Sequence, residues 1–578
     1  MIRPRVLLAT EGTYPFHQGG VSTWCDTLVH RLSSVDFVIF AVAMNPYVSS
    51  QFSLPTNVQR VIAVPLWGMQ DPSEHRDDLA YSEIFLQKQR TGRAEIQSLF
   101  LPVFETFLDT LIGGQPGSLG VALSQMYRYF RTYDYQETFK NPAVWDAYKT
   151  WVMKTAEQGY WQQPSIFESV QGLGWLYHFL TVINNAIPPV DMVHSSAAAF
   201  CGITGIVSKL TFGTPYLLTE HGVYLREQYL GIGRSNMTPF SKRFLITLVK
   251  AITQENLHYA DELVPVCAFN SRWERVLGAD ASKIRVIYNG VDPAIFHPAL
   301  LPSPPRETLE ILSVARVDPN KDLETLLKAV HQVRAFGYRV HVRVLGSVSV
   351  PTYAEKITQL QKELGLDDVV EFMGHQQDIS DAYRKADIAV QSSVTEAFPY
   401  SVIEAMMSGL PMVATDVGGT REALGTTGIL VPSRDPFQLA LGIAMLASNA
   451  ELRHRLGAEA QKRARHHFDI STTMNAFLAL YNDWQKKAPP HSDNQKDSVV
   501  TMLARGWALA QIGARREALS EYTRALQELS GRAGGIVVMR EIARLHWEEG
   551  NTDNAYASLI KARILEKIYT SSEPKAAS

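Results

Sequence analysis

The sequence predicts an α/β protein built on two doubly wound parallel sheets. Short runs of β-branched and aliphatic residues alternate with longer amphipathic stretches along much of the chain. Apolar strands that are separated by helical patterns are typical of parallel sheets covered on both faces. The length of 578 residues gives room for about three or four domains. A composition of 46% hydrophobic and 20% charged residues is that of a globular protein.

The expected strands are short and apolar. The first covers residues 6–9, because the apolar run that follows Met1 is too short for the core of a signal peptide and gives way to Glu11. The later strands are expected at residues 37–42, 192–194, 216–219, 262–266, 285–288, 309–314, 341–345, 369–372, 388–391 and 412–415. Sheets of this kind bind ligands in the crevice beyond the carboxyl ends of their strands.

A proline-rich segment at residues 296–305 marks the boundary between the two α/β domains, because its prolines remove backbone donors just before a new strand. The first domain therefore covers residues 1–297 and the second covers residues 298–487. Residues 67–188 interrupt the first domain with helical patterning and many Tyr and Trp residues. We interpret these aromatic side chains as the core of a helical insertion, with an acceptor-binding surface as the alternative.

A polar linker at residues 488–494 precedes a helical extension over residues 496–570. Two segments of this extension match at a spacing of 37, which pairs Gly513 with Gly550, Ala518 with Ala555, and Ala525 with Ala562. Small residues where helices cross, with glycine at the turn, resemble tetratricopeptide (TPR) repeats. Because such arrays usually need about three units, we expect this pair to pack against the rest of the protein or against a partner protein. An ordinary helical tail is the alternative.

Charge, cysteine content and hydropathy exclude several classes of protein. A formal net charge of −3 argues against nucleic-acid binding, which needs many cations on one face. Without a run of about 18 apolar residues, no membrane span is expected. The cysteines Cys25, Cys201 and Cys267 are far apart, so they predict neither a disulfide framework nor a metal site. The sequence thus predicts a cytoplasmic protein in a reducing compartment.

Two motifs of the first domain follow predicted strands. Gly19 and Gly20 stand between the first strand and an amphipathic helix, where backbone N–H groups can approach an anion; simple turn glycines are the alternative. His221 follows the strand at residues 216–219 and precedes a glycine, so it is expected to face the crevice. Most lone histidines are only packed or surface residues, which is the alternative here. His194 is a weaker candidate.

In the second domain, Arg316 and Lys321 follow the strand at residues 309–314. Asp318 or Asn320 is expected to cap the next helix, which would put Lys321 in its first turn. A cation there opposes the helix dipole unless an anionic ligand binds at the same place. We therefore interpret Arg316 and Lys321 as a clamp for a diphosphate, with a solvated surface pair as the alternative.

A third group consists of Glu396, Ser401 and Glu404. Glu396 lies in a loop beyond a strand, and a helix is expected to begin near Ser401. Two carboxylates around one helix start can accept hydrogen bonds from sugar hydroxyls, while the free N–H groups between them receive phosphate. Ser401 and Glu404 also fit the S-x-x-E pattern of a capping box, which is a purely structural alternative for Glu404.

Together these motifs resemble the family 4 retaining glycosyltransferases, whose GT-B fold has two Rossmann-like domains facing a cleft. The resemblance covers most of residues 1–487 and includes residues 289–292 (Asn-Gly-Val-Asp). Residues 11–15, residues 219–224 and the helical insertion are similar to the PelF-like branch, which is linked to bacterial exopolysaccharide synthesis. The loop at residues 398–400 (Phe-Pro-Tyr) departs from the commoner glycine-containing form, which puts the choice of donor in doubt.

The resemblance implies a role for each site residue. Arg316 and Lys321 would bind the donor diphosphate, and the helix start at Ser401 would lie at the same donor. Glu404 would bind the ribose hydroxyls, and Glu396 would contact the donor sugar near the reacting carbon. His221 would lie on the opposite wall, and Gly19 and Gly20 would let their loop approach the phosphates. The family acts without a bound metal or cofactor.

The sequence therefore predicts a retaining glycosyltransferase that moves a sugar from a nucleotide sugar, UDP-linked, to a saccharide acceptor in exopolysaccharide synthesis. A nucleotide-sugar epimerase or a glycosyl phosphorylase on a similar fold is one alternative. A docking subunit without activity, recruited to a membrane-bound polysaccharide synthase by the C-terminal repeats, is another.

Overall fold

The computed structural model describes residues 3–76, 78–79, 81–299, 307–488, 506, 510, 515–528, 534–548 and 550–570. The chain divides into two compact units. One unit consists of Met1–Asp78 and Thr91–Pro489, and the other consists of Leu79–Arg90 and Pro490–Ser578.

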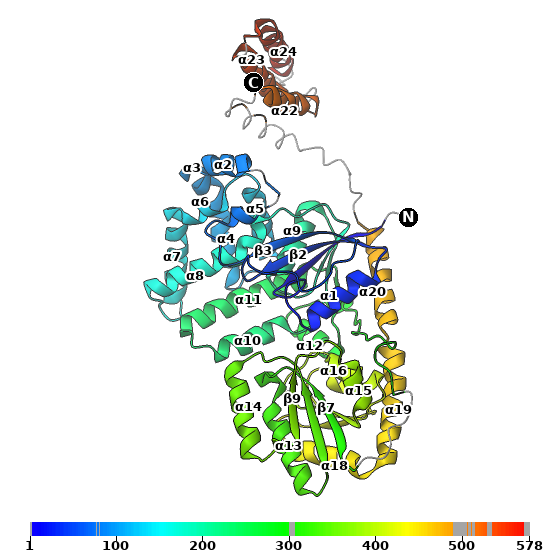
Figure 1. Cartoon of the computed structure of the whole chain (residues 1–578). Coiled ribbons are helices and arrows are strands. Elements are labelled where there is room, and N and C mark those ends of the chain that lie inside the picture. Colours follow the sequence, from blue (N-terminus) through cyan, green and yellow to red (C-terminus); the bar gives the residue numbers. More distant parts are fainter. Residues whose placement is uncertain are drawn as a thin grey trace. The chain divides into compact units, whose positions relative to one another are not determined.

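The first unit contains two six-stranded sheets (Figure 1). The N-terminal sheet has the order β3-β2-β1-β4-β5-β6, and all its neighbouring strands are parallel. Its strands are β1 (Arg5–Glu11), β2 (Asp36–Ala43), β3 (Val58–Pro65), β4 (Met192–Ser195), β5 (Tyr216–Leu218) and β6 (Glu262–Leu263). The strand order reverses between β1 and β4, and ligands of such sheets bind beyond the carboxyl ends of the strands at this point.

The C-terminal sheet repeats this topology with the order β12-β11-β10-β7-β8-β9, again with parallel neighbours. Its strands are β7 (Leu309–Val314), β8 (Val340–Leu345), β9 (Val370–Gly374), β10 (Ile388–Gln391), β11 (Met412–Thr415) and β12 (Ile429–Val431). Its order reverses between β7 and β10. The prediction of two Rossmann-like domains with parallel sheets is therefore confirmed.

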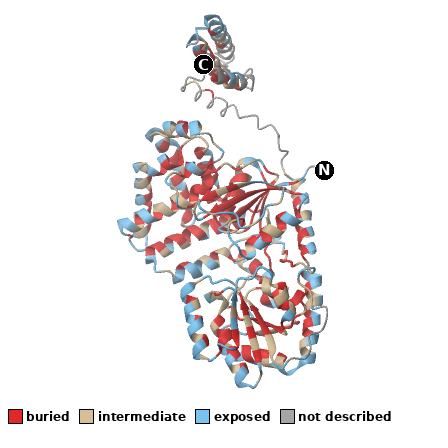
Figure 2. Ribbon diagram, viewed as in Figure 1, coloured by how far each residue is buried: buried red, intermediate tan, exposed pale blue. Residues whose placement is uncertain are grey.

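Helices cover both faces of the two sheets, and the strands between them are largely buried (Figure 2). The N-terminal domain contributes α1 (Gly20–Arg31), η4 (Phe200–Gly202), α9 (Ile203–Phe212), α10 (Tyr224–Arg234), α11 (Pro239–Tyr259), α12 (Ala268–Val276) and η5 (Ala281–Lys283). The C-terminal domain contributes η6 (Pro319–Lys321), α13 (Leu323–Ala335), α14 (Pro351–Glu363), α15 (Ser380–Lys385), α16 (Tyr400–Met407), α17 (Thr420–Leu424), α18 (Pro436–Ser448), α19 (Ala450–His467) and α20 (Ile470–Gln485).

The chain between β3 and β4 is mainly helical. Within the first unit it forms η1 (Pro72–His75), α3 (Arg93–Glu95), a π-helical turn η2 (Ile96–Phe100), α4 (Leu101–Leu111), α5 (Ser118–Phe130), α6 (Tyr135–Lys140), α7 (Pro142–Glu157), α8 (Ile166–Phe179) and η3 (Leu180–Asn184). Capping residues define several of these starts: Asn141 caps α7 just before a proline, and Ser165 forms a capping box with Glu168 in α8. Aromatic side chains such as Tyr148 and Trp161 are buried in this part of the core.

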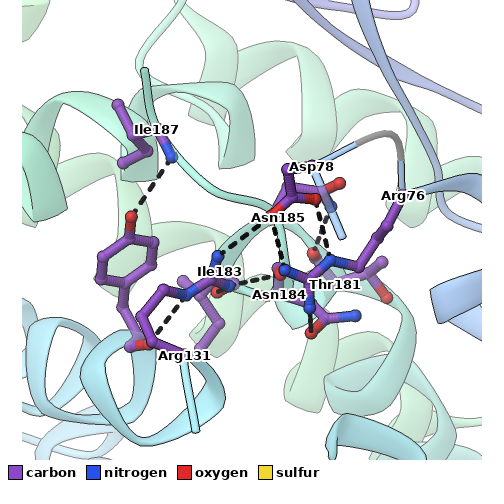
Figure 3. A network of polar contacts seen from close by, with 9 residues as sticks. Arg76, Asp78, Arg131, Thr181, Ile183, Asn184, Asn185 and Ile187 are labelled. Atoms are coloured by element: carbon purple, nitrogen blue, oxygen red, sulfur yellow. Dashed lines mark hydrogen bonds and ion pairs between the residues drawn. The ribbon is translucent and has the colours of Figure 1, made fainter. Parts of the chain in front are cut away.

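Partly shielded charges join this helical segment to the helical turn η3, which precedes β4 (Figure 3). The guanidinium of Arg76 donates to the Asp78 carboxylate at 2.6 Å and to Asn184 Oδ1 at 3.2 Å. Arg131 of α5 donates to the carbonyl oxygen of Ile183 at 3.1 Å and forms an ion pair with Asp78 at 3.7 Å. Burial lowers the pKa of Arg131 to about 10, so the side chain remains charged at neutral pH.

Helix α20 returns from the C-terminal domain and packs on the N-terminal sheet. Its residues Met474, Phe477 and Tyr481 share a buried cluster with Leu8 of β1 and Trp24 of α1. The Tyr481 hydroxyl hydrogen-bonds to Nδ1 of His194 at 2.6 Å, and Nε2 of His194 hydrogen-bonds to the hydroxyl of Thr219 at 2.8 Å. Burial lowers the pKa of His194 to about 3, so this weaker site candidate is a neutral packing residue.

The chain passes from the N-terminal to the C-terminal domain near Val291 and returns near Phe468 to Ile470, and these two crossing segments lie side by side. The N–H of Val291 donates to the carbonyl of Phe468 at 2.9 Å, and the N–H of Ile470 donates to the carbonyl of Val291 at 3.1 Å. A Cβ at Gly290 would lie 2.7 Å from Cα of Ile470 and 2.6 Å from Oγ1 of Thr473. Only glycine therefore fits where the crossings touch.

One predicted strand is absent. Residues 285–288 form no strand, although the N–H groups of Arg285 and Ile287 donate to the carbonyls of Leu263 and Pro265. The segment is extended beside β6 but turns toward the domain crossing before a ladder develops. The proline-rich boundary is only partly described, because residues 300–306 lie outside the described residues, as do residues 489–494 of the polar linker.

The second unit contains α2 (Tyr81–Arg90), α22 (Arg515–Glu528), α23 (Gly534–Glu548) and α24 (Thr552–Thr570). The paired alanines of the repeat, Ala518, Ala525, Ala555 and Ala562, are buried. Gly550 lies between α23 and α24 with a φ of 79°, whereas Gly513 lies outside the described residues. The similarity to TPR repeats stays a prediction. Among the described helices, none is long and apolar enough to cross a membrane.

The hydrogen bond between α20 and β4 gives a stability prediction. Tyr481→Phe leaves a buried ring nitrogen of His194 without a partner, so we expect the free energy of unfolding to fall by about 1–3 kcal/mol. Chemical denaturation measures this change. The control is Tyr47→Phe, because Tyr47 is 84% exposed. Equal stability of the two variants would contradict a role for this bond in attaching α20.

Candidate active site

A cavity of about 310 Å³ lies between the two domains of the first unit. The N-terminal domain lines it with α10 and the beginning of α12. The C-terminal domain lines it with the loop that follows β7 and the loop between β10 and α16. The cavity therefore lies beyond the carboxyl ends of β7 and β10, where the strand order of the C-terminal sheet reverses.

Lys321 and Glu396 form an ion pair in this cleft. Nζ of Lys321 donates to Oε1 of Glu396 at 2.5 Å, and the hydroxyl of Ser393 donates to the same oxygen at 2.6 Å. The two side chains are 22% and 10% exposed, so the pair borders the cleft but is mostly shielded from water. Such shielding strengthens the attraction between charges.

The local position of Lys321 differs from the prediction. Asp318 caps the short turn η6, and Asp322, with a φ of 46°, caps α13. Lys321 therefore ends η6 and precedes the first turn of α13. Its backbone is fixed by Ser392, whose hydroxyl donates to the carbonyl of Lys321 at 2.8 Å. The ammonium group is thus directed by the loop after β10.

Arg316 is an exposed cation on the C-terminal wall of the cleft. Its guanidinium makes no hydrogen bond or ion pair with any residue that the structure describes. A guanidinium presents several N–H donors in one plane, which suits bidentate binding of phosphate oxygens. The structure therefore brings Arg316, Lys321 and Glu396 together at one cavity, with positive charge still unneutralised.

Two arginines that we did not anticipate extend from the opposite domain. Arg226 of α10 donates to the hydroxyl of Thr395 at 2.5 Å, and Arg234 donates to Oδ1 of Asn320 at 3.4 Å. Arg226, Leu230 and Arg234 follow one another at i, i+4 and i+8, so they share one face of the helix. The sequence alone could have shown this shared helix face from the spacing. It could not have shown that the face lines the cleft, because that depends on how the two domains are arranged.

Glu404 and Ser401 lie in α16 behind the cleft. The N-cap of α16 is Pro399, without a side-chain capping bond, so the alternative of a capping box between Ser401 and Glu404 is wrong. The hydroxyl of Tyr383, from α15, instead donates to Oε2 of Glu404 at 2.8 Å. Burial raises the pKa of Glu404 to about 7. Tyr383 was missed because its partner is 21 positions away in the chain.

The start of α1 faces the start of α16 across the domains. Gly19 is the N-cap of α1 and has open space on its side-chain side. A Cβ at Gly20 would lie 3.7 Å from the ring of Tyr400. The two helix N-termini, which carry free N–H groups, thus come from opposite domains toward one region. That the backbone N–H groups at Gly19 and Gly20 approach a bound anion stays a prediction.

His221 packs edge-to-face against Trp24 of α1, with ring centroids 4.5 Å apart. Its Nε2 is buried and has no partner among the described residues. Burial lowers the pKa of His221 to about 3, so the ring is neutral at physiological pH. Among the described residues, the lining of the 310 Å³ cavity includes neither His221 nor Glu404.

Glycine is required where the turn after β11 touches the Glu396 loop. Gly418 has a φ of 57°, and a Cβ there would lie 1.7 Å from the carbonyl oxygen of Glu396. The next residue, Gly419, donates its N–H to the carbonyl of Ala397 at 2.6 Å. The turn therefore fixes the backbone that carries Glu396.

No group of three His, Cys, Asp or Glu side chains in the described part of the chain is arranged to hold a metal ion.

Comparison with known proteins agrees with this geometry. Residues 302–463 match the family described as Glycosyl transferases group 1, and residues 4–282 match a domain of unknown function, DUF3492. The D-inositol 3-phosphate glycosyltransferase of Geodermatophilus obscurus is 31% identical over 253 residues, 41% of this chain and 55% of that protein. The enzyme of the same name from Thermomonospora curvata is 33% identical over 245 residues, 38% of this chain and 57% of that protein. The chain thus spans about half the length of the curated relatives it matches.

Two solved structures share the fold over most of this chain. Sucrose-phosphate synthase from Thermosynechococcus elongatus has a TM-score of 0.54 at 18% identity, over 84% of this chain and 100% of that one. The Anabaena protein HepE in complex with UDP has a TM-score of 0.51 at 14% identity, over 83% of this chain and 100% of that one. These likenesses confirm the predicted GT-B fold.

The contact at Gly418 gives a prediction with a matched control. Gly418→Ala must displace the Glu396 loop, whereas Gly365→Ala introduces the same left-handed strain (φ 63°) with no atom within 4 Å. We expect Gly418→Ala to lower the free energy of unfolding by about 1–3 kcal/mol more than the control does. Chemical denaturation of both variants measures the difference, and equal losses would contradict the tight contact.

Proposed function

We propose that this protein is a retaining glycosyltransferase that transfers a sugar from a UDP-linked donor to a saccharide acceptor. The observation that carries the proposal is the interdomain cleft in which Arg316, Lys321 and Glu396 meet. The group 1 domain at residues 302–463 and the UDP bound to the structurally similar HepE support the choice of donor.

Fixed positive charge would drive departure of the leaving group. Breaking the bond between a sugar and a diphosphate builds negative charge on the diphosphate, and preorganised donors in a water-poor site stabilise it. Arg316 supplies a free guanidinium, and Lys321 supplies an ammonium held by the loop after β10. Arg226 and Arg234 bring two further cations from the other domain.

The carboxyl groups would orient the donor. Glu396, at the edge of the cleft, would accept hydrogen bonds from the sugar and offset positive charge near the reacting carbon. Glu404, directed by Tyr383, would bind the ribose hydroxyls. His221, kept neutral by burial, would contact sugar or acceptor from the N-terminal side. With the acceptor attacking from the face of the leaving group, the configuration at the sugar is retained.

The finer assignment rests on the sequence. We propose that the protein is a family 4 enzyme of the PelF-like branch and that it extends a bacterial exopolysaccharide precursor. The motifs around Glu11 and His221 and the helices between β3 and β4 support this branch. The helices of the second unit would dock the enzyme to a membrane-bound synthase complex.

Removal of the charged groups tests the function. We expect Lys321→Ala to lower the rate of sugar transfer by about 10²–10³-fold, the effect of deleting one donor to a developing charge. Glu404→Ala should weaken donor binding and lower transfer, with the fold intact by circular dichroism. The matched control is Lys356→Ala, because Lys356 pairs with Glu324 on the surface, where ion pairs contribute little. Full activity of both cleft variants would refute their roles.

The donor and the reaction class are tested together. A ligand at about 100 times its dissociation constant stabilises a protein by about 2.7 kcal/mol, so UDP should raise the melting temperature of the wild type and much less that of Lys321→Ala. Turnover of the nucleotide sugar without acceptor would indicate an epimerase, and turnover that needs free phosphate would indicate a phosphorylase. If UDP does not stabilise the protein and no nucleotide sugar is turned over, the alternative of a docking subunit without activity is favoured.

A further inference from the structure

A carboxylate of the C-terminal domain caps a helix of the N-terminal domain. Helix α12 begins at the edge of the cleft, where the two domains meet (Figure 1). Its N-cap residue, Cys267, makes no side-chain capping bond. The Glu422 side chain, from α17, instead accepts from the N–H of Ala268 at 2.8 and 2.9 Å and from the N–H of Phe269 at 3.3 Å. Two N–H groups at the start of α12 are therefore satisfied from the other domain.

The same carboxylate binds the chain just before the domain crossing. The hydroxyl of Tyr288 donates to Oε1 of Glu422 at 2.7 Å. Burial raises the pKa of Tyr288 above its usual value, so the phenol keeps its proton and acts as a donor. A negative charge is favourable at a helix N-terminus, which is the positive end of the helix dipole. Hydrogen bonds to an ionised acceptor are also stronger than those between neutral groups.

Glu422 is fixed within its own domain. The guanidinium of Arg463, from α19, donates to the backbone carbonyl of Glu422 at 2.7 Å. Three residues before Glu422, the N–H of Gly419 donates to the carbonyl of Ala397 at 2.6 Å. Ala397 directly follows Glu396, so α17 and the Glu396 loop form one fixed group of atoms.

The first turn of α12 forms part of the opposite wall. Phe269 and Asn270 both line the 310 Å³ cavity. Nδ2 of Asn270 donates to the backbone carbonyl of Glu220 at 3.0 Å. Glu220 immediately precedes His221, so a shift of this helical turn also displaces the chain at His221. The first turn of α12 thus fixes two parts of the N-terminal wall.

We propose that Glu422 is a positioning residue, which holds the first turn of α12 opposite the Glu396 loop so that both walls of the cleft act on one donor. This inference rests on the proposed function. Separation of the domains would take the acceptor away from the first N–H groups of α12, because Cys267 does not cap them. Closure of the cleft and order of its N-terminal wall therefore occur together.

Replacement of Glu422 should lower turnover more than donor affinity. Arg316 and Lys321 belong to the same domain as Glu422, so binding of the diphosphate does not need the contact with α12. We expect Glu422→Ala to lower kcat by about 10–100-fold, because the two walls are then misplaced, while KM for the nucleotide sugar changes less than about threefold. Glu422→Gln keeps one acceptor oxygen, so its kcat should lie between those of Glu422→Ala and the wild type.

The matched control is Asp435→Ala, which removes a helix cap within one domain. Asp435 accepts from the N–H of Gln438 at 3.0 Å and caps α18, with both groups in the C-terminal domain. Because this cap joins no second domain, its loss should leave kcat unchanged.

A double variant separates positioning from capping. Serine is a favoured N-cap residue, and Cys267 already has the extended backbone of an N-cap, with a φ of −163° and a ψ of 160°. In Cys267→Ser combined with Glu422→Ala, α12 regains a cap from its own domain but no contact with α17. We expect the melting temperature to return toward that of the wild type while kcat stays low. Recovery of kcat together with the melting temperature would overturn the positioning role.

Hydrogen–deuterium exchange tests the contact without substrate. In peptides that cover residues 267–270, the amides of Ala268 and Phe269 should exchange about 5–30-fold faster in Glu422→Ala than in the wild type, as expected for a lost helix cap. Asp435→Ala should leave this exchange unchanged. Equal exchange in Glu422→Ala and the wild type would overturn the cap itself. If the wild type transfers no sugar from any nucleotide sugar, the proposed function fails and the positioning role with it, while the exchange still decides whether Glu422 caps α12.

Discussion

The paired crossing at Gly290–Val291 and Phe468–Ile470 is the constraint on which the site depends. Each sheet is parallel, so its polar loops gather at one edge, but a single edge holds only half of the site. Two hydrogen bonds join the crossings, and α20 then packs on the N-terminal sheet. This attachment brings α10 of one domain opposite the η6 and Glu396 loops of the other.

The site is also a place where charge is kept away from water. Glu396 is balanced by the ammonium of Lys321, whereas the Glu404 carboxyl accepts a hydrogen bond from the neutral hydroxyl of Tyr383. Desolvation raises the pKa of a carboxyl and lowers that of an imidazole, so Glu404 titrates near neutral pH while His221 stays neutral. Such perturbed groups gather where proteins bind and transform ligands.

Sequence reasoning anticipated the cleft-lining residues of the C-terminal domain better than those of the N-terminal domain. Arg316, Lys321 and Glu396 could be predicted because they follow β7 and β10, and the end of a strand can be recognised in the sequence as the end of an apolar run. The alternative of a capping box at Ser401 and Glu404 was wrong, because the helix has its N-cap at Pro399, two residues earlier than that pattern requires. The strand expected at residues 285–288 failed because the chain leaves the sheet there for the crossing. Arg226, Arg234 and Tyr383 were missed, because their partners lie across the cleft or on another helix.

By itself the sequence determined the fold class, the positions of most of the strands and the polar residues at their ends. These depend on local patterns, namely hydrophobic runs and the glycines and prolines that interrupt them. Only the tertiary structure decided which strand ends face each other, which arginines reach the cleft and which carboxyls are buried. Those properties depend on contacts between residues far apart in the chain, and burial sets the charge of a group through the atoms that surround it.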